Sequence, residues 1–231
     1  MILFHGVSSD DVRVIVEEYP DRPVPKRKIE RFSIPGRSGD IVATEDAWEN
    51  VTQSYSIYVS AEGPGLSIIA DKAVQWLMVP GYHILEDEYD HNTFRMASFL
   101  GPNNLANTLN MFGRARIEFD CWPQRFLKNG ARPLRMAQDA TLVNPSIYTA
   151  EPLIVVHGAG AGVLRVGDYQ VTISDCNEIT LDCREEDAYR GVSNLNTAVE
   201  GEFPKLPAGN SLVSWSGGIT AVDIAPRWFV L

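Results

Sequence analysis

Residues Val51–Ser60 have the sequence VTQSYSIYVS, in which larger side chains alternate with small polar ones. Successive side chains of a β-strand point to opposite faces, so Val51, Tyr55, Ile57 and Val59 share one face with Gln53. The other face carries serine, threonine and one tyrosine. The pattern predicts a β-strand with one buried and one exposed face.

Three further segments of the first half have a similar character. Val12–Val16 is rich in β-branched residues, which favour strands. Thr93–Leu100 and Arg114–Trp122 alternate in the same way as Val51–Ser60. The first half of the chain is therefore predicted to be mainly β, with the architecture of a β-sandwich or split barrel.

One segment of the first half has helical periodicity instead. Pro64 suits a first helical turn, and Pro80-Gly81 suits a helix stop. The apolar residues between them recur at spacings of three and four, which places them on one helical face. They are Leu66, Ile69, Ala73, Trp76 and Leu77. We expect one α-helix here, packed against a sheet.

Residues Leu127–Ser146 are less periodic and contain several turn-forming pairs, which indicates a domain boundary. We predict an N-terminal domain of residues 1–145 and a C-terminal domain of residues 146–231. Short strand-like segments separated by turns fill the second domain and favour a β-sandwich. They are Leu153–His157, Val163–Val166, Tyr169–Ile173, Ile179–Cys183, Ser211–Trp215, Ala221–Ile224 and Trp228–Leu231.

Charge and composition exclude several classes of function. The 231 residues carry a net charge of -10, and neither half is basic, which argues against nucleic-acid binding. No apolar run approaches the ~20 residues of a membrane span, and no secretion signal is recognisable, so we expect folding in a cytoplasm. Cys121, Cys176 and Cys183 have no paired spacing, and we expect buried free thiols.

A basic, proline-rich segment lies between Asp21 and Arg37. Such a segment is difficult to bury, so we expect an exposed arm or hairpin. Two interpretations remain open: a solvated loop, or an arm that reaches a neighbouring subunit. The basic residues that would make the contact in the second case are Lys26, Arg27, Lys28 and Arg31.

Two glycine-rich segments suggest chemistry that their surroundings do not support. His157–Gly162 follows a predicted strand, but the dinucleotide fingerprint requires a third glycine at Val163 and a helix after it. We predict a tight hairpin there instead. Ser38 lies between Gly36 and Gly39 with no neighbouring base, and the chain has no G-x-S-x-G elbow, so we do not expect a serine hydrolase.

The segment between residues 83 and 91 is the densest in side chains that bind metals. Its spacing matches no closed metal site, so we expect a solvated acidic turn between two strands, with neither metal nor cofactor. A glycosidase would need two carboxylates at a set distance, which a sequence cannot measure. The side chains concerned are His83, Glu86, Asp87, Glu88, Asp90 and His91.

Trp215 and Trp228 lie in the last predicted strands. Aromatic side chains at such positions usually fill a sandwich core, which is the interpretation we favour. The alternative is an exposed platform that stacks on sugars, as in modules that bind cell-wall polysaccharide.

Two motifs, in this order, resemble those of the distal tail proteins of siphophages. The first is the turn Pro35-Gly36-Arg37 with Gly39, ahead of the alternating strand Val51–Ser60. The second is Phe203-Pro204 with Gly209, followed by Trp215 and by Pro226-Arg227-Trp228. The resemblance extends over nearly the whole chain.

The resemblance implies a structural protein of the phage tail tip and no enzyme. Proteins of that family form hexameric rings that join the tail tube to the baseplate and enclose the DNA channel. Their N-terminal domain makes the ring, and their C-terminal domain is a galectin-like β-sandwich. The implied partners are the major tail tube protein, the tape-measure protein, the tail-associated hub protein and a receptor-binding protein. DNA would pass through without specific binding, and the virion would assemble in the bacterial cytoplasm. The competing interpretations are the carbohydrate-binding module and a glycosidase.

Overall fold

The computed structural model describes residues 1–60, 65–108 and 112–231. The chain is mainly β, as predicted, and it divides into two compact units. The first unit is Met1–Arg125 with Leu231, and the second is Phe126–Val230. Among the described residues, no helix has the length and the apolar character that a membrane crossing requires.

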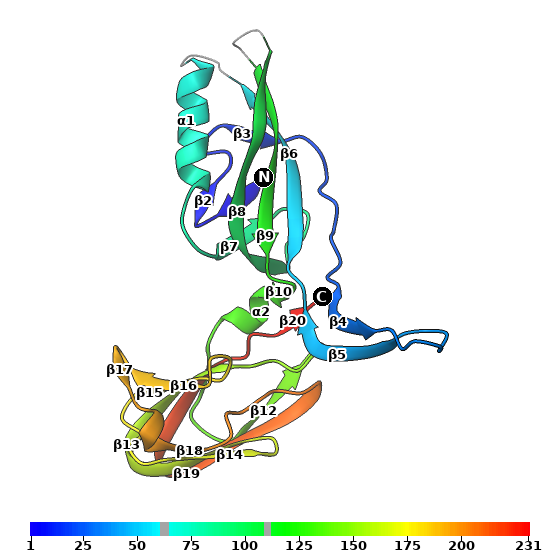
Figure 1. Ribbon diagram of the computed structural model, residues 1–231. Helices are drawn as coiled ribbons and strands as arrows, with labels where there is room; N and C mark the ends of the chain where they lie inside the picture. The colour runs from blue at the N-terminus through cyan, green and yellow to red at the C-terminus, as the bar shows by residue number, and fades with distance from the viewer. Residues whose placement is uncertain (61–64, 109–111) are drawn as a thin grey trace. The chain divides into compact units, whose positions relative to one another are not determined.

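The first unit is built on an antiparallel sheet with the strand order β2-β1-β7-β8-β9-β6-β3 (Figure 1). Long central strands run next to each other, and short ones lie at the edges. Their bounds are β1 Ile2–Phe4, β2 Val7–Ser8, β3 Val14–Val16, β6 Val51–Ser60, β7 His83–Asp87, β8 Thr93–Thr108 and β9 Phe112–Cys121.

Strand β6 confirms the alternation seen in the sequence. It pairs with β9 along its full length, from Val51 opposite Cys121 to Ser60 opposite Phe112. Val51, Tyr55 and Ile57 are buried on one face, together with Gln53 and Val59. Burying an apolar side chain of this size stabilises a fold by about 1.5–3 kcal/mol, so this face anchors the core of the first unit.

Helix α1 (Leu66–Leu77) is the predicted helix, and it lies along the sheet of the first unit (Figure 1). Ile69, Ala73, Trp76 and Leu77 are buried in the core, as their spacing predicts. Trp76 Nε1 also donates hydrogen bonds to two backbone carbonyls, those of Phe4 and Val7, both at 3.2 Å. Pro64 and the side chain of Leu66 lie outside the described part of the chain. A second helix, α2 (Lys128–Ala131), has four residues and was not predicted.

The arm takes the form of a two-stranded hairpin of β4 (Arg27–Phe32) and β5 (Ile41–Trp48) (Figure 1). These two strands pair with each other, from Arg27 opposite Trp48 to Phe32 opposite Ile41, and form a sheet of their own. Every residue of β4 is exposed. The sequence predicts an exposed arm or hairpin at this place, but it gives no strand pattern over β5.

The second unit is an antiparallel sheet with the order β11-β19-β13-β15-β16-β17, in which β12 also pairs with β19, and β14 joins β13 to β18. A single apolar core lies inside it. The bounds are β11 Leu134–Met136, β12 Ala140–Asn144, β13 Leu153–Val166, β14 Tyr169–Ile173, β15 Ile179–Asp182, β16 Asp187–Arg190, β17 Ser193–Asn194, η1 Asn196–Ala198, β18 Val199–Gly201 and β19 Gly209–Ala225. Short β20 (Phe229–Val230) pairs with β10 (Arg125–Leu127).

Two predictions about the second unit were wrong in the same way. The glycines of His157–Gly162 do not form a hairpin between two strands but lie inside one long strand, β13. Likewise Ser211–Trp215 and Ala221–Ile224 belong to a single strand, β19. The pairing register of β13 and β19 shifts at Gly158 and again before Gly162, which marks a β-bulge.

Glycine is required at this bulge because the two backbones touch. A Cβ atom at Gly158 would lie 2.1 Å from the carbonyl oxygen of Gly218, and one at Gly218 would lie 1.9 Å from that of Ala159. The glycines therefore mark a close approach of two strands and not a turn. The partner strand lies some 60 residues away in the sequence.

The unit boundary lies between Arg125 and Phe126, earlier in the chain than the expected position near residue 145. Strands β11 and β12 explain the difference, because both pair with β19 and so belong to the second sheet. Their short, irregular sequences resemble a linker when they are taken without their partner strand.

Candidate functional site

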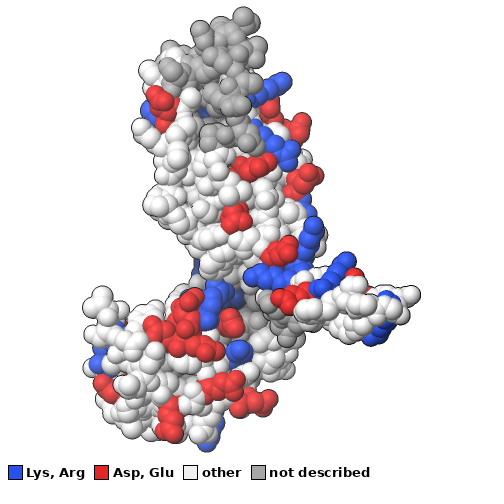
Figure 2. All heavy atoms as spheres, viewed as in Figure 1, with Lys and Arg blue, Asp and Glu red and all other residues white. Residues whose placement is uncertain are grey.

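The hairpin carries the basic residues singled out from the sequence. Lys26 precedes β4, and Arg27, Lys28 and Arg31 lie on it, all exposed. The Arg27 guanidinium carbon lies 4.6 Å from the centroid of the Trp48 ring, a cation–π contact across the two strands. Figure 2 shows Lys and Arg side chains on the hairpin beside a large uncharged surface.

That uncharged surface is the feature that the sequence analysis missed. Phe32 and Val42 are each 50% exposed, and Ile29, Ile34 and Ile41 are exposed as well. Cross-strand neighbours share a face, so Phe32 and Ile41 lie on one side of the ribbon, and Val42 lies on the other with Arg31. An isolated two-stranded ribbon is marginally stable in water, so one with apolar side chains on both faces suits burial by another molecule.

The turn motif forms the tip of this hairpin. Gly36 and Gly39 have φ values of 81° and 86°, a region that favours glycine. The Arg37 amide donates to the carbonyl of Ile34 at 3.1 Å, which closes a turn after Pro35. The motif leads into β5 and reaches the alternating strand β6 only afterwards.

The C-terminal motif holds the end of the second unit. Pro204 and Trp228 are buried, while Phe203 and Trp215 pack against the core from partly buried positions. Trp228 packs against Gly130, where a Cβ atom would lie 2.8 Å from the backbone nitrogen of Trp228. Gly209, with φ 86°, begins β19. Because Trp228 lies in the core, it is not available to stack on a sugar.

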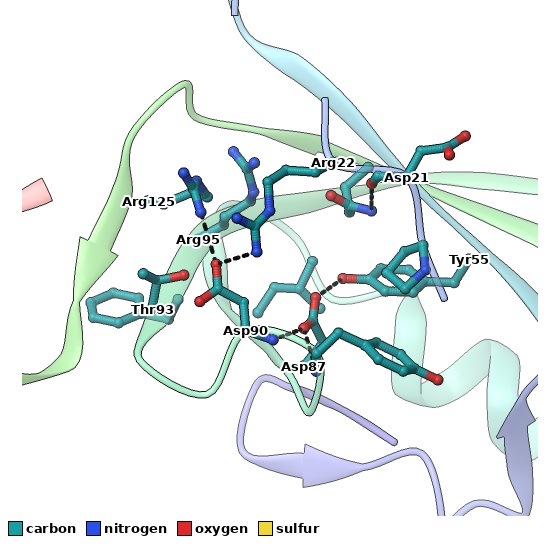
Figure 3. A pocket seen from close by; sticks show the side chains of 13 residues that line it. Asp21, Arg22, Tyr55, Asp87, Asp90, Thr93, Arg95 and Arg125 are labelled. Carbon is teal, nitrogen blue, oxygen red and sulfur yellow. Dashed lines mark hydrogen bonds and ion pairs between the residues drawn. The ribbon is translucent and has the colours of Figure 1, made fainter. Parts of the chain in front are cut away.

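The acidic segment does not form a fully solvated turn, contrary to the sequence interpretation. Asp87 and Asp90 line a small cavity of about 60 Å³ in the first unit, together with Arg22, Arg95 and Arg125 (Figure 3). Its other lining residues are Pro20, Asp21, Gln53, Tyr55, Leu85, Tyr89, Thr93 and Phe94.

Both carboxylates of this cavity are hydrogen-bonded. Asp87 accepts a hydrogen bond from the Tyr55 hydroxyl at 3.0 Å and from the amides of Tyr89 and Asp90 at 3.0 and 2.8 Å. Asp90 lies 2.9 Å from Arg125 Nη1 and 3.4 Å from Arg22 Nη2. Burial favours a higher pKa for Asp90, but hydrogen bonds from Thr93 and Arg125 and the two positive charges hold its pKa below the ordinary value.

Two other members of the segment have partners elsewhere. His83 Nδ1 lies 2.9 Å from His5 Nδ1, and Glu88 forms an ion pair with the α-amino group of Met1. Across residues 1–60, 65–108 and 112–231, no three His, Cys, Asp or Glu side chains converge in a way that would hold a metal ion.

Comparison with solved structures identifies proteins of similar fold. The SPP1 Dit protein, a paradigm of the hub adsorption apparatus in phages that infect Gram-positive bacteria, matches 100% of this chain and 98% of its own, with a TM-score of 0.75 and 13% identity. The two chains share a fold. A chain of the phage P2 baseplate in its activated conformation matches 92% of this chain and 90% of its own, with 10% identity and a TM-score of 0.49. No protein-family model matches this chain, and no curated protein sequence matches it significantly.

Proposed function

We propose that this chain is a non-enzymatic structural subunit of the tail-tip hub of a siphophage. The observation that carries the proposal is the fold match to the SPP1 Dit protein over the whole length of both chains. The two sequence motifs support it independently, because Pro35–Gly39 and Phe203–Trp228 resemble those of siphophage distal tail proteins.

In this role six copies form a ring around the DNA channel and join the tail tube to the baseplate. The first unit makes the ring, and the second unit, a galectin-like β-sandwich, faces outward. The partners are the major tail tube protein, the tape-measure protein, the tail-associated hub protein and a receptor-binding protein. The net charge of -10 suits a channel through which DNA slides without binding. The protein then resides in the virion after assembly in the host cytoplasm.

The hairpin of β4 and β5 is the part of the first unit best suited to join neighbouring copies. Its exposed apolar side chains, Phe32, Ile41 and Val42 among them, lie on both faces of a ribbon that pairs with no other described strand. Its basic residues, Lys26, Lys28 and Arg31, complement the acidic surface of a second copy. A contact of this kind is heterologous, and repetition around an axis closes it into a ring.

Negative-stain imaging with mass measurement of the purified full chain tests the ring. The expected particle has six-fold symmetry, a central hole and six times the 25.6 kDa chain mass. Rings of another symmetry, or particles without a hole, contradict the proposed assembly.

A pair of double variants tests the arm. Phe32→Ser with Ile41→Ser removes apolar contacts from the hairpin and is expected to convert rings into monomers. Val143→Ser with Leu212→Ser removes two comparably exposed apolar side chains from the second unit and serves as the control. Replacing Lys26, Arg27, Lys28 and Arg31 by Ser tests the charge contribution. Unchanged rings in both the apolar double variant and the basic quadruple variant of the hairpin would show that the arm does not hold the ring together.

A further inference from the structure

Arg95 is an unusual buried charge in the first unit. It projects from β8 into the cavity described above, and only 7% of the residue is exposed. Its Nη1 atom is buried and has no hydrogen-bond partner among the described residues. A buried cation without a partner is costly, so either solvent or a ligand is expected to complete its surroundings.

The carboxylates of the cavity are already engaged by other groups. Asp90 is bound by Arg125 and Arg22, and Asp87 accepts hydrogen bonds from Tyr55 and two backbone amides. Asp21 contributes its backbone carbonyl, which accepts a hydrogen bond from Gln53 Nε2 at 3.0 Å, and Figure 3 shows its carboxylate turned away from the arginines. Arg95 is thus left without a bonded counter-charge.

The side chains that face the cavity include more guanidinium groups than carboxylates. Three guanidinium groups (Arg22, Arg95 and Arg125) face two carboxylates (Asp87 and Asp90). Arg125 is engaged twice, because its Nη2 also donates to the main-chain oxygen of Leu231 at 2.9 Å. Arg95 is the guanidinium that lacks a partner, and a single anionic group would supply one. The cavity of about 60 Å³ admits a group of a few heavy atoms. The planar fork of a guanidinium group matches the two oxygens of a carboxylate.

We propose that the cavity bounded by Arg22, Arg95 and Arg125 binds one carboxylate group, with Arg95 Nη1 as its principal donor. The carboxylate belongs either to a small free acid or to an acidic side chain of a second copy of this chain. The site does not depend on the proposed tail-hub function, because it rests on the charges and hydrogen bonds of the first unit alone.

Acetate is the probe for this site. The unfolding temperature of the full chain is measured at neutral pH in sodium acetate and in sodium chloride of equal ionic strength. For the native sequence we expect the unfolding temperature to be about 2–4 °C higher in acetate, when the acetate concentration is well above its dissociation constant. Arg95→Met should lose this increment. The matched control Arg116→Met, which removes an exposed arginine from β9 of the same sheet, should retain it.

Saturation-transfer NMR to the acetate methyl group tests the native sequence without any variant. Transfer that chloride does not suppress, and that is lost in Arg95→Met, supports the site. No transfer to acetate, or an equal acetate increment in Arg95→Met and the native chain, overturns it.

Sedimentation velocity then separates the two sources of the carboxylate. If a second copy supplies it, both acetate and Arg95→Met weaken self-association of the chain. If a free acid supplies it, neither changes self-association while the acetate increment persists. Both outcomes keep the site and differ only in what fills it.

Discussion

Arg227 forms a bidentate ion pair with Asp182, in which Nη1 donates to Oδ1 at 2.6 Å and Nη2 donates to Oδ2 at 3.0 Å. The pair ties the Pro226-Arg227-Trp228 motif to the end of β15 within the second unit. Burial favours a higher pKa for Asp182, but the hydrogen bonds and charge of Arg227 and two backbone amides hold its pKa below the ordinary value. The motif is therefore a structural clamp at the end of the chain's second sheet.

Breaking this pair with Asp182→Asn should destabilise the second unit by about 2 kcal/mol, because a partly buried arginine loses a charge-assisted bidentate contact. Since the folded pKa of Asp182 is lowered, its contribution is full above the unfolded pKa of about 3.9 and is lost as pH falls through the folded pKa. Thermal unfolding of the native chain and the variant between neutral pH and pH 3 measures both effects. The two curves should converge at the acid end. Asp168→Asn, an exposed turn residue with the same charge change, is the control; an equal loss in both variants would contradict the clamp.

The bulge between β13 and β19 should not tolerate a side chain at Gly218. Gly218→Ala places a Cβ 1.9 Å from a backbone oxygen, so one strand must shift, and we expect a loss of more than about 3 kcal/mol in unfolding free energy. Gly209→Ala, also on β19, meets open space and pays only for its positive φ, about 1 kcal/mol. Chemical denaturation of both variants checks the difference, and similar losses would show that the backbones are not in contact.

The Tyr55 hydroxyl should contribute to the stability of the first unit. Tyr55→Phe removes the hydrogen bond to Asp87 at 3.0 Å and leaves that carboxylate with one partner fewer. We expect a loss of about 1–2 kcal/mol, measured by denaturation. Burial, followed by the charge of Asp87, raises the pKa of Tyr55 well above its usual value, so the effect should persist through alkaline pH. Tyr19→Phe, on an exposed ring, should be neutral; a Tyr55→Phe variant as stable as the native chain would show that the bond contributes nothing.

The three cysteines should be unreactive in the folded protein. All are free and buried, and burial raises the pKa of Cys121 and of Cys183 to about 12. A thiol reagent at pH 8 should therefore modify no cysteine of the native chain within the time that it modifies all three in denaturant. Rapid labelling of Cys121 or Cys183 under native conditions would mean that the cores of the two units open readily.

Sequence periodicity predicted those elements whose two faces differ. β6 alternates because one side of it lies in the core, and α1 has an apolar stripe for the same reason. The strand β5 gives no such signal, since Ile41 and Val42 are both exposed although they point to opposite faces of the hairpin. Its apolar residues became visible as a candidate contact surface only once their exposure was known.

The elements that were mispredicted depend on partners distant in the chain. The glycines after His157 suggest a turn locally, but the approach of Gly218 places them inside a strand. The cavity at Asp87 and Asp90 needs Arg22 and Arg125, from segments remote in sequence. Local composition therefore suggested an acidic, solvated turn where the folded chain places these carboxylates among arginine side chains.

Gold-labelled antibodies against the chain, applied to intact virions of the phage that encodes it, test the central proposal most directly. The account predicts labelling confined to the tip of the tail, where the tube meets the adsorption apparatus. Labelling of the capsid or along the tail shaft, or virions that carry none of the protein, would contradict it.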